Sequence, residues 1–303
     1  MFGKNFFVLL LSLFLFSENA KSQEDKVKKD TTLVFSGDAS LNFSNVGLSN
    51  WSGGGDSSIS IGGVFNGKIS KKYKKSLLEQ VFSVNFGMAR LGNKENLFKK
   101  TDDQFILETS FTHKIKKHWN FSSNINIRSQ MIPGYSYATN EDGNEFEDQL
   151  ISNFLAPGYI SKGVGIQYKD AIFSISYSLF TGKTTLVLNE DLSNKGAFGV
   201  RPGTHERFEF GMNMNAQIET NLSEDIKFKS VLNLFSNYQT VDKVDVNWEN
   251  ILELKVNKYI NTNFGTSLIY DHDVLIAQND GGLSRKVQFK NILNLTFGTK
   301  FTF

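Results

Sequence analysis

The 303-residue sequence contains no cysteine, only 3 prolines and only 4 histidines. The absence of cysteine excludes a disulfide framework and a lipid anchor attached to cysteine. Without cysteine or paired histidines, the sequence also lacks the ligand spacing of a metal site. Scarce proline, together with 25 Gly and 28 Phe, fits long β-strands better than helices. We therefore expect no cofactor and no metal.

No charge sign dominates, and only one long apolar run is present. The 33 Lys and Arg residues against 31 Asp and Glu residues leave a formal net charge of +2, which argues against a nucleic acid partner. The apolar run, residues 6–16, is too short to span a bilayer as a helix. It follows Lys4 and precedes a small-residue site, which predicts a secretory signal peptide over residues 1–22, cleaved near Ser22/Gln23. We expect residues 23–31 to form a short disordered periplasmic segment, because they are mostly charged.

Two-residue periodicity fills the remaining sequence and is clearest at its C-terminal end. From Val287 to Phe303, seven of nine odd positions are apolar, whereas Ile292 is the one large apolar residue among the even positions. A transmembrane β-strand needs about 9–11 residues that are apolar outside and polar inside. The terminal Phe303 resembles the sorting signal of bacterial outer-membrane barrels, which implies the barrel-assembly machinery as a partner.

Eleven further segments share this period. The connections between them alternate between short and long, as the periplasmic turns and extracellular loops of bacterial barrels do, except for the short connection 240–243. We therefore predict an all-β fold: a transmembrane antiparallel up-and-down β-barrel of about 12 strands over residues 32–303, in the outer membrane of a Gram-negative cell. The segments are residues 32–44, 57–70, 77–89, 104–116, 119–130, 159–169, 171–180, 207–220, 226–239, 244–256 and 260–270.

The polar faces of these strands would line the lumen of the barrel. Charges of both signs occur there, so no single ion type is favoured. Each charge could contact a solute or could satisfy a neighbour in an internal ion pair. A barrel of this size could hold a narrow channel, or be closed by paired charges and loops. Our lumen-lining candidates are Glu108, Arg128, Arg207, Glu209, Lys229, Glu249, Glu253 and Lys290.

Two loop segments combine glycine or proline with aromatic residues. One contains Trp51-Ser52-Gly53-Gly54 and the other Phe154-Leu155-Ala156-Pro157-Gly158. Glycine runs allow tight backbone paths, so we expect these loops to fold into the barrel mouth. The mouth or plug candidates are Trp51, Gly53, Gly54 and Pro157.

These two elements resemble those of an uncharacterised family of Bacteroidota-type outer-membrane proteins. That family, a domain of unknown function, carries Trp-Ser-x-Gly-Gly and Phe-Leu-Ala-Pro-Gly elements. The resemblance covers most of residues 31–303. It implies a barrel, and it brings no activity and no functional residues to this sequence.

The histidines give little support for catalysis. His272 lies between Asp271 and Asp273 at an outer strand end, and Asp102-Asp103 lies at another, so a water-activating His/Asp pair is conceivable there. The spacing is not diagnostic, and we expect no enzyme and no catalytic residue. Our leading prediction is a porin-like narrow channel or solute-uptake barrel. The alternatives are a structural or accessory subunit of an outer-membrane complex, and an outer-membrane hydrolase. The expected partners are outer-membrane lipid and an outer-membrane or periplasmic protein.

Overall fold

The computed structural model describes residues 33–46, 58–92, 96–257, 259–277 and 282–302. The chain divides into two units, residues 1–30 and 31–303, and all described residues belong to the second. The predicted signal peptide, the segment 23–31, the candidates Trp51, Gly53 and Gly54, and Phe303 lie outside the described residues. Among the described residues, no helix is long and apolar enough to cross a membrane.

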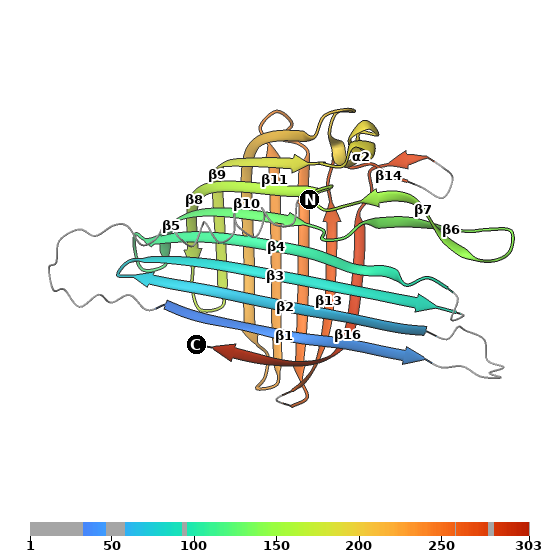
Figure 1. The fold of residues 1–303 in the computed structure, drawn as a ribbon. Coiled ribbons are helices and arrows are strands. Elements are labelled where there is room, and N and C mark those ends of the chain that lie inside the picture. The colour runs from blue at the N-terminus through green and yellow to red at the C-terminus, as the bar shows by residue number, and fades with distance from the viewer. Residues whose placement is uncertain (1–32, 47–57, 93–95, 258, 278–281, 303) are drawn as a thin grey trace, which may run out of the picture. The chain divides into compact units, whose positions relative to one another are not determined.

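Twelve antiparallel strands close into a barrel, which confirms the predicted fold class (Figure 1). Each barrel strand pairs with the barrel strand before it, and β16 pairs with β1. The strands are long enough to cross a bilayer at a tilt, because even the shortest has 11 residues. They are β1 (Leu33–Val46), β2 (Ser58–Tyr73), β3 (Ser76–Leu91), β4 (Lys99–Lys114), β5 (Trp119–Ser129), β8 (Gly158–Lys169), β9 (Phe173–Leu186), β10 (Glu206–Asn221), β11 (Ile226–Asn237), β12 (Val244–Lys255), β13 (Ile260–Tyr270) and β16 (Gln288–Thr302).

Short turns join the strands at one end of the barrel, and every connection at the other end is longer, including 238–243, of which the sequence predicted only 240–243 as a short connection. The short turns are residues 74–75, 115–118, 170–172, 222–225 and 256–259. Three connections at the other end, predicted only as loops, contain structure. These elements are the hairpin β6 (Gly134–Thr139) and β7 (Glu145–Ser152), the helix α2 (Glu190–Asn194) with the 3-10 turn η1 (Ala197–Gly199), and the small hairpin β14 (Ile276–Ala277) and β15 (Leu283–Ser284).

Large apolar side chains are exposed around the outside of the barrel. Leu41, Phe208 and Phe289 are each more than 60% exposed, and they come from β1, β10 and β16. Such exposure is explained when the surrounding medium is apolar, because soluble monomers rarely expose large contiguous apolar patches. The alternation in the sequence therefore arises from an apolar outward face and a polar inward face.

The densely buried apolar cluster lies in the long loops rather than in the barrel wall. Ala156, Val187, Leu192 and Val200 are buried together, and Phe198 packs against them. The side chain of Asn189 begins α2 by accepting the backbone N–H of Leu192, which fixes the start of this short helix. We call the packed segments 150–157 and 187–200 the loop cap.

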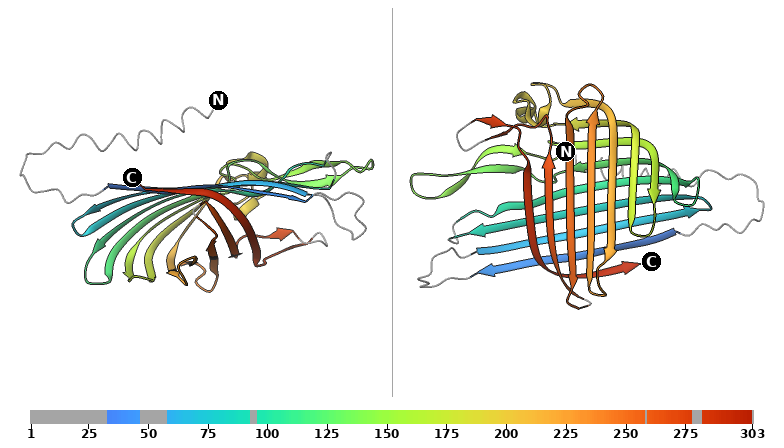
Figure 2. Two further views of the ribbon diagram at one scale, coloured as in Figure 1. Left: turned by 90° about the horizontal axis from the view of Figure 1, so that it is seen from below. Right: turned by 180° about the vertical axis from the view of Figure 1, so that it is seen from behind.

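The last strand bends between two walls of the barrel. β16 pairs with β13 from Gln288 to Phe297 and with β1 from Thr296 to Thr302. Figure 2 shows β10–β13 and the first part of β16 crossing over β1–β5. Gly298 lies at the bend, where its N–H donates to the Tyr259 carbonyl over 2.9 Å. A Cβ atom at this position would collide with the Ala39 carbonyl oxygen, so the crossing requires glycine.

Candidate functional site

An ion pair spans the lumen between two strands that are far apart in the ring. Arg128 Nη2 on β5 lies 3.4 Å from Glu249 Oε1 on β12. Strands β8, β9, β10 and β11 lie between β5 and β12 in the ring, so the two residues belong to nearly opposite walls. Both were predicted from the sequence to line the lumen. The structure brings them together as a pair that narrows the lumen at this level.

A second predicted pair of charges lies close to this bridge. Glu108 on β4 interacts electrostatically with Lys229 on β11 and with Arg128. β4 and β11 are not neighbours in the ring, so this interaction also acts across the lumen. Glu253 on β12 lies opposite Lys227 in the β11–β12 register. The polar inner face of the barrel therefore holds charges of both signs, several of which lie near a charge of the opposite sign.

Lys290, the predicted lumen residue on the last strand, contacts the wall beyond β1. Its Nζ lies 2.9 Å from Asp102 Oδ1 on β4, and β1, β2 and β3 separate these two strands. The Lys290 side chain is 45% exposed, so it is reachable by solutes. Asp102 was considered as a member of a water-activating pair. In the structure its carboxylate binds Lys290 instead.

A cluster of charges near the long-loop end of the barrel surrounds Lys183. Its Nζ lies 2.5 Å from Asp245 Oδ2, 3.5 Å from Asp271 Oδ2 and 3.6 Å from Glu209 Oε2. The ammonium also lies over the Phe235 ring, 5.1 Å from its centroid. The Lys183 side chain is only 13% exposed, so little water reaches its charge. The three carboxylates stabilise this charge instead.

Lys183 was not among the predicted lumen residues, and a β-bulge explains why. The β9 residues Ser178 and Thr181 face positions only two apart on β10, namely Asn213 and Gly211. The extra residue on β9 makes Leu179 and Phe180 both exposed and reverses the alternation beyond them. Lys183 therefore faces inward, although a simple continuation of the period would place it outward.

Arg207 and Glu209, both predicted to line the lumen, join the same cluster. Arg207 Nη2 lies 3.2 Å from Glu209 Oε2, and Arg207 Nη1 lies 2.5 Å from Asp273 Oδ2. Asp273 belongs to the connection that follows β13. Arg207 thus ties that connection to β10 in the same way that Lys183 ties it to β9.

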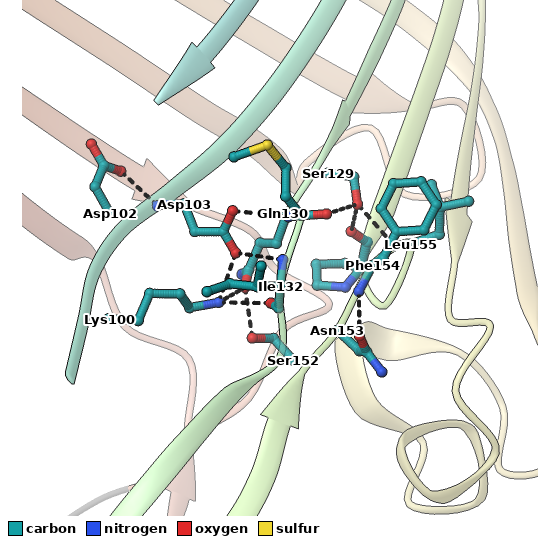
Figure 3. Close-up of polar contacts among 12 residues, drawn as sticks. Lys100, Asp102, Asp103, Ser129, Gln130, Ile132, Ser152, Asn153, Phe154 and Leu155 are labelled. Atoms are coloured by element: carbon teal, nitrogen blue, oxygen red, sulfur yellow. Dashed lines mark hydrogen bonds and ion pairs between the residues drawn. The ribbon is translucent and has the colours of Figure 1, made fainter. Parts of the chain in front are cut away.

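A different polar network fixes the connection between β5 and β8 (Figure 3). The Asp103 carboxylate accepts the backbone N–H groups of Met131 and Ile132 at 2.9 and 3.1 Å. Lys100 Nζ donates to Asp103 Oδ2 at 2.9 Å and to Gln130 Oε1 at 2.7 Å. The Asp103 side chain is 1% exposed, so its charge is fully engaged in holding the loop. This residue anchors a loop and has no arrangement that would activate water.

The predicted mouth residue Pro157 lies beside this network. The Ser129 hydroxyl accepts the N–H of Leu155 over 2.9 Å and lies 3.1 Å from the Pro157 carbonyl oxygen. By strand alternation, Asp103 and Ser129 share the outward face of β4 and β5 with Phe105 and Ile125. The loop at 153–157 is therefore held against the outer side of the wall at the mouth. A plugging role for Pro157 stays a prediction.

The histidines make structural contacts in the structure. His272 Nδ1 lies 3.4 Å from Tyr270 Oη, and the His272 backbone N–H donates to Asp245 Oδ1. His205 Nδ1 lies 2.9 Å from the Val187 carbonyl oxygen and supports the loop cap. Within the described ranges, no group of three or more His, Cys, Asp or Glu residues is arranged to hold a metal ion.

Comparisons with known proteins relate part of the sequence to a family and most of the fold to outer-membrane proteins. The family described as "Protein of unknown function (DUF3078)" matches residues 43–135, a range that includes the Trp51-Ser52-Gly53-Gly54 element. No curated protein matches the sequence.

Several solved structures are similar to this barrel along most of its length. An outer-membrane channel of the COG4313 group from Pseudomonas putida F1 is 8% identical with a TM-score of 0.38, over 92% of this chain and 100% of the other. OmpT of Vibrio cholerae is 8% identical with a TM-score of 0.29, over 93% and 100%. The outer-membrane channel DcaP of Acinetobacter baumannii is 7% identical with a TM-score of 0.29, over 92% and 99%.

Proposed function

We propose that this protein is an outer-membrane β-barrel that forms a narrow channel for small polar solutes and ions. The observation that carries the proposal is the Arg128–Glu249 ion pair, which joins nearly opposite walls through a polar lumen. An arginine and a glutamate can meet in this way only where the two walls are close together. The lumen is therefore polar enough to hold water and too narrow at this level for large solutes.

The membrane location rests on the outside of the barrel. Exposed large apolar side chains project from most of the barrel strands, with Leu41, Trp248 and Leu293 as examples from three strands. In water this surface would promote association, whereas in a bilayer it is solvated by hydrocarbon. The secretory signal peptide expected at residues 1–22 agrees with export to the outer membrane.

The mixture of charges in the lumen supports weak ion selectivity. Arg128 and Lys229 face Glu249 and Glu108, so neither sign dominates the constriction. A strongly selective pore would present one dominant sign at its narrowest level. The loop at 153–157 is held against the outer side of the wall, which supports an open mouth on that side of the barrel.

An accessory role in an outer-membrane complex is the second candidate, and the hairpin β6–β7 favours it. The hairpin β6–β7 extends beyond the ends of the barrel strands (Figure 1). It carries the exposed apolar residues Phe146 and Ile151, with Phe154 close by. A packed base with exposed apolar residues on a projecting arm is suited to protein contact. Co-purification of a stable partner in mild detergent, lost on deletion of residues 135–149, would favour this role.

Solute flux into proteoliposomes tests the channel proposal. We expect vesicles containing the protein to swell with small sugars and amino acids, and not with large oligosaccharides. Arg128→Gln should raise the size limit because it removes the bridge across the lumen, whereas Lys195→Gln on the exposed loop cap should change nothing. Absence of flux through both the wild type and Arg128→Gln would contradict the channel and leave the accessory role as the better account.

A further inference from the structure

The barrel closes along a seam that is paired over only part of its length. β1 and β16 are in register from Ser36↔Thr302 to Asn42↔Thr296, which is seven residue pairs. β1 pairs with β2 over fourteen positions, and β16 pairs with β13 over ten. Beyond Asn42 and Thr296 the two seam strands separate, and both views in Figure 2 show β16 turning away from β1.

We call the space between residues 43–46 of β1 and 288–295 of β16 the split. Among the described residues, 43–46 of β1 and the facing residues 292–295 of β16 have no register partner on the side that faces the split. Unpaired backbone groups at an open sheet edge are costly in hydrocarbon, so such edges persist only where they are covered or line a polar cavity. The unpaired backbone groups at the split would therefore be stabilised by a molecule that carries hydrogen-bonding groups.

The lips of the split are strongly apolar on the outward face. Leu293 on β16 is 72% exposed, the highest value among the large apolar residues that the structure describes, and Phe289 and Phe43 are also well exposed. These side chains would lie in the hydrocarbon of the bilayer. The outer side of the split thus suits a hydrocarbon chain, whereas its strand edges suit a polar group.

A groove continues the split along the outside of the seam. It has a volume of about 710 Å³, and its outward wall includes Ala39, Leu41, Gly63, Phe65, Phe86 and Phe297. Ala39 has only a methyl group and Gly63 has no side chain, so these positions leave space between the larger side chains of the groove. The volume falls within the range of about 300–1,000 Å³ that is common for small-molecule sites.

A charged pair spans the split on the lumen side. Lys290 comes from the separated part of β16, and its partner Asp102 lies on β4, beyond β1, β2 and β3. The pair links β16 to β4 at 2.9 Å, and 45% of the Lys290 side chain remains exposed. An anionic head group entering through the split would compete with Asp102 for this ammonium group.

We infer that the split is a lateral portal that admits an anionic, single-chain amphiphile between the bilayer and the lumen. The hydrocarbon chain lies in the groove and between the apolar lips, and the head group binds Lys290. Such a molecule combines a hydrocarbon chain that suits the apolar lips with a head group that suits Lys290. The portal goes beyond the proposed channel, because it concerns passage through the wall and does not require ion conduction.

Photolabelling in proteoliposomes tests the portal. The probe is a palmitate analogue with a diazirine on its chain, and the labelled residues are mapped by mass spectrometry. We expect labels concentrated on residues 39–43 and 289–297, in excess over Ile125 and Trp248 on other walls. An even distribution over all outward apolar residues would overturn the proposal, because it would show ordinary contact with bulk lipid.

Two substitutions with matched controls sharpen the test. Ala39→Phe fills the groove and should reduce labelling at the seam, whereas Ala216→Phe on β10 should not. Lys290→Gln should weaken competition by unlabelled palmitate about tenfold, the loss of one charge-assisted hydrogen bond, and should leave competition by hexadecanol unchanged. Lys229→Gln, which removes a positive charge elsewhere in the lumen, is the matched control and should leave competition by palmitate unchanged.

The competing occupant is a strand from another protein that pairs with the open edges. Recovery of such a partner attached to residues 289–297, with no excess of lipid label there, would overturn the portal. Equal effects of Lys290→Gln and Lys229→Gln on palmitate competition would also overturn it. Solute flux measured on the same vesicles reports the channel separately, so failure of one proposal is distinguishable from failure of the other.

Discussion

Lys183 on β9 and Asp271, the first residue after β13, lie 3.5 Å apart and join the barrel wall to the long connection that ends at β16. The same ammonium group binds Asp245 and Glu209. This single cation therefore holds three carboxylates together in a largely buried site. It makes the position of the connection depend on a residue that belongs to the wall.

Lys183→Met should destabilise both the connection and the barrel. Removing one partner of a buried ion pair leaves uncompensated charge, at a cost of about 3–5 kcal/mol. We expect a lower midpoint of urea unfolding and faster hydrogen exchange at residues 271–277. Lys195→Met, on the exposed surface of the loop cap, is the matched control. Equal stability of the Lys183 and Lys195 variants would show that the cluster does not hold the connection.

Asp103→Asn should loosen the start of the connection between β5 and β8. The amide retains the shape of the carboxylate but weakens the contacts to Lys100, Met131 and Ile132, at a local cost of about 1–3 kcal/mol. Limited proteolysis should then cut residues 133–151 faster than in the wild type. Asp148→Asn, on the exposed β7 strand, should leave the cleavage rate unchanged. If both variants resist cleavage equally, Asp103 is not the anchor.

Asp170 should contribute to stability in a pH-dependent way at the short-turn end. Its carboxylate accepts the backbone N–H groups of Phe173 and Ile172, and these hydrogen bonds lower its pKa below the usual value. Because the pKa of Asp170 is lower in the folded state, its contribution to the free energy of unfolding is complete above the unfolded-state pKa of about 3.9. This contribution is lost as the pH falls through the folded-state pKa. Comparing the wild type with Asp170→Asn should therefore show a stability difference at neutral pH that disappears in strong acid. A difference that grows in acid would contradict this sign.

Adjacent residues on β5 should differ strongly in how much stability the same substitution costs. Ile125 faces outward and Asn126 faces inward, beside Glu108 in the register of β4 and β5. Ile125→Arg places a charge in hydrocarbon and should cost about 2–4 kcal/mol near the bilayer centre. Asn126→Arg should reduce the free energy of unfolding much less, because the new positive charge lies beside the Glu108 carboxylate in the polar lumen. Urea unfolding in lipid vesicles measures both, and similar losses would contradict the assigned faces.

The sequence predicts the barrel wall well because each wall strand repeats a simple alternation. The prediction ended β9 at Phe180, whereas the strand continues to Leu186, because the bulge near Ser178 reverses the period there. Likewise β4 begins at Lys99 rather than Gln104, where polar residues extend the pairing beyond the apolar surface. The loop cap and the hairpin β6–β7 were not predicted, because the short helix and the hairpin carry no repeated pattern.

Contacts across the lumen could not be read from the sequence. Arg128 and Glu249 are 121 positions apart, and their contact depends on which strands oppose each other in the closed ring. The sequence identified both residues as lumen-lining without pairing them. The split seam depends on the bend of β16 at Gly298, and a single glycine in an alternating strand does not predict its direction.

Single-channel conductance in planar bilayers tests the narrow, ion-paired lumen most directly. The wild type should show small, weakly selective conductance steps, and Arg128→Gln and Glu249→Gln should each enlarge them. The double variant should resemble the single ones, because either substitution already breaks the bridge. Ile125→Leu on the outward face should conduct as the wild type does. Wild-type steps as large as those of an open porin, or steps that neither lumen variant changes, would contradict the account.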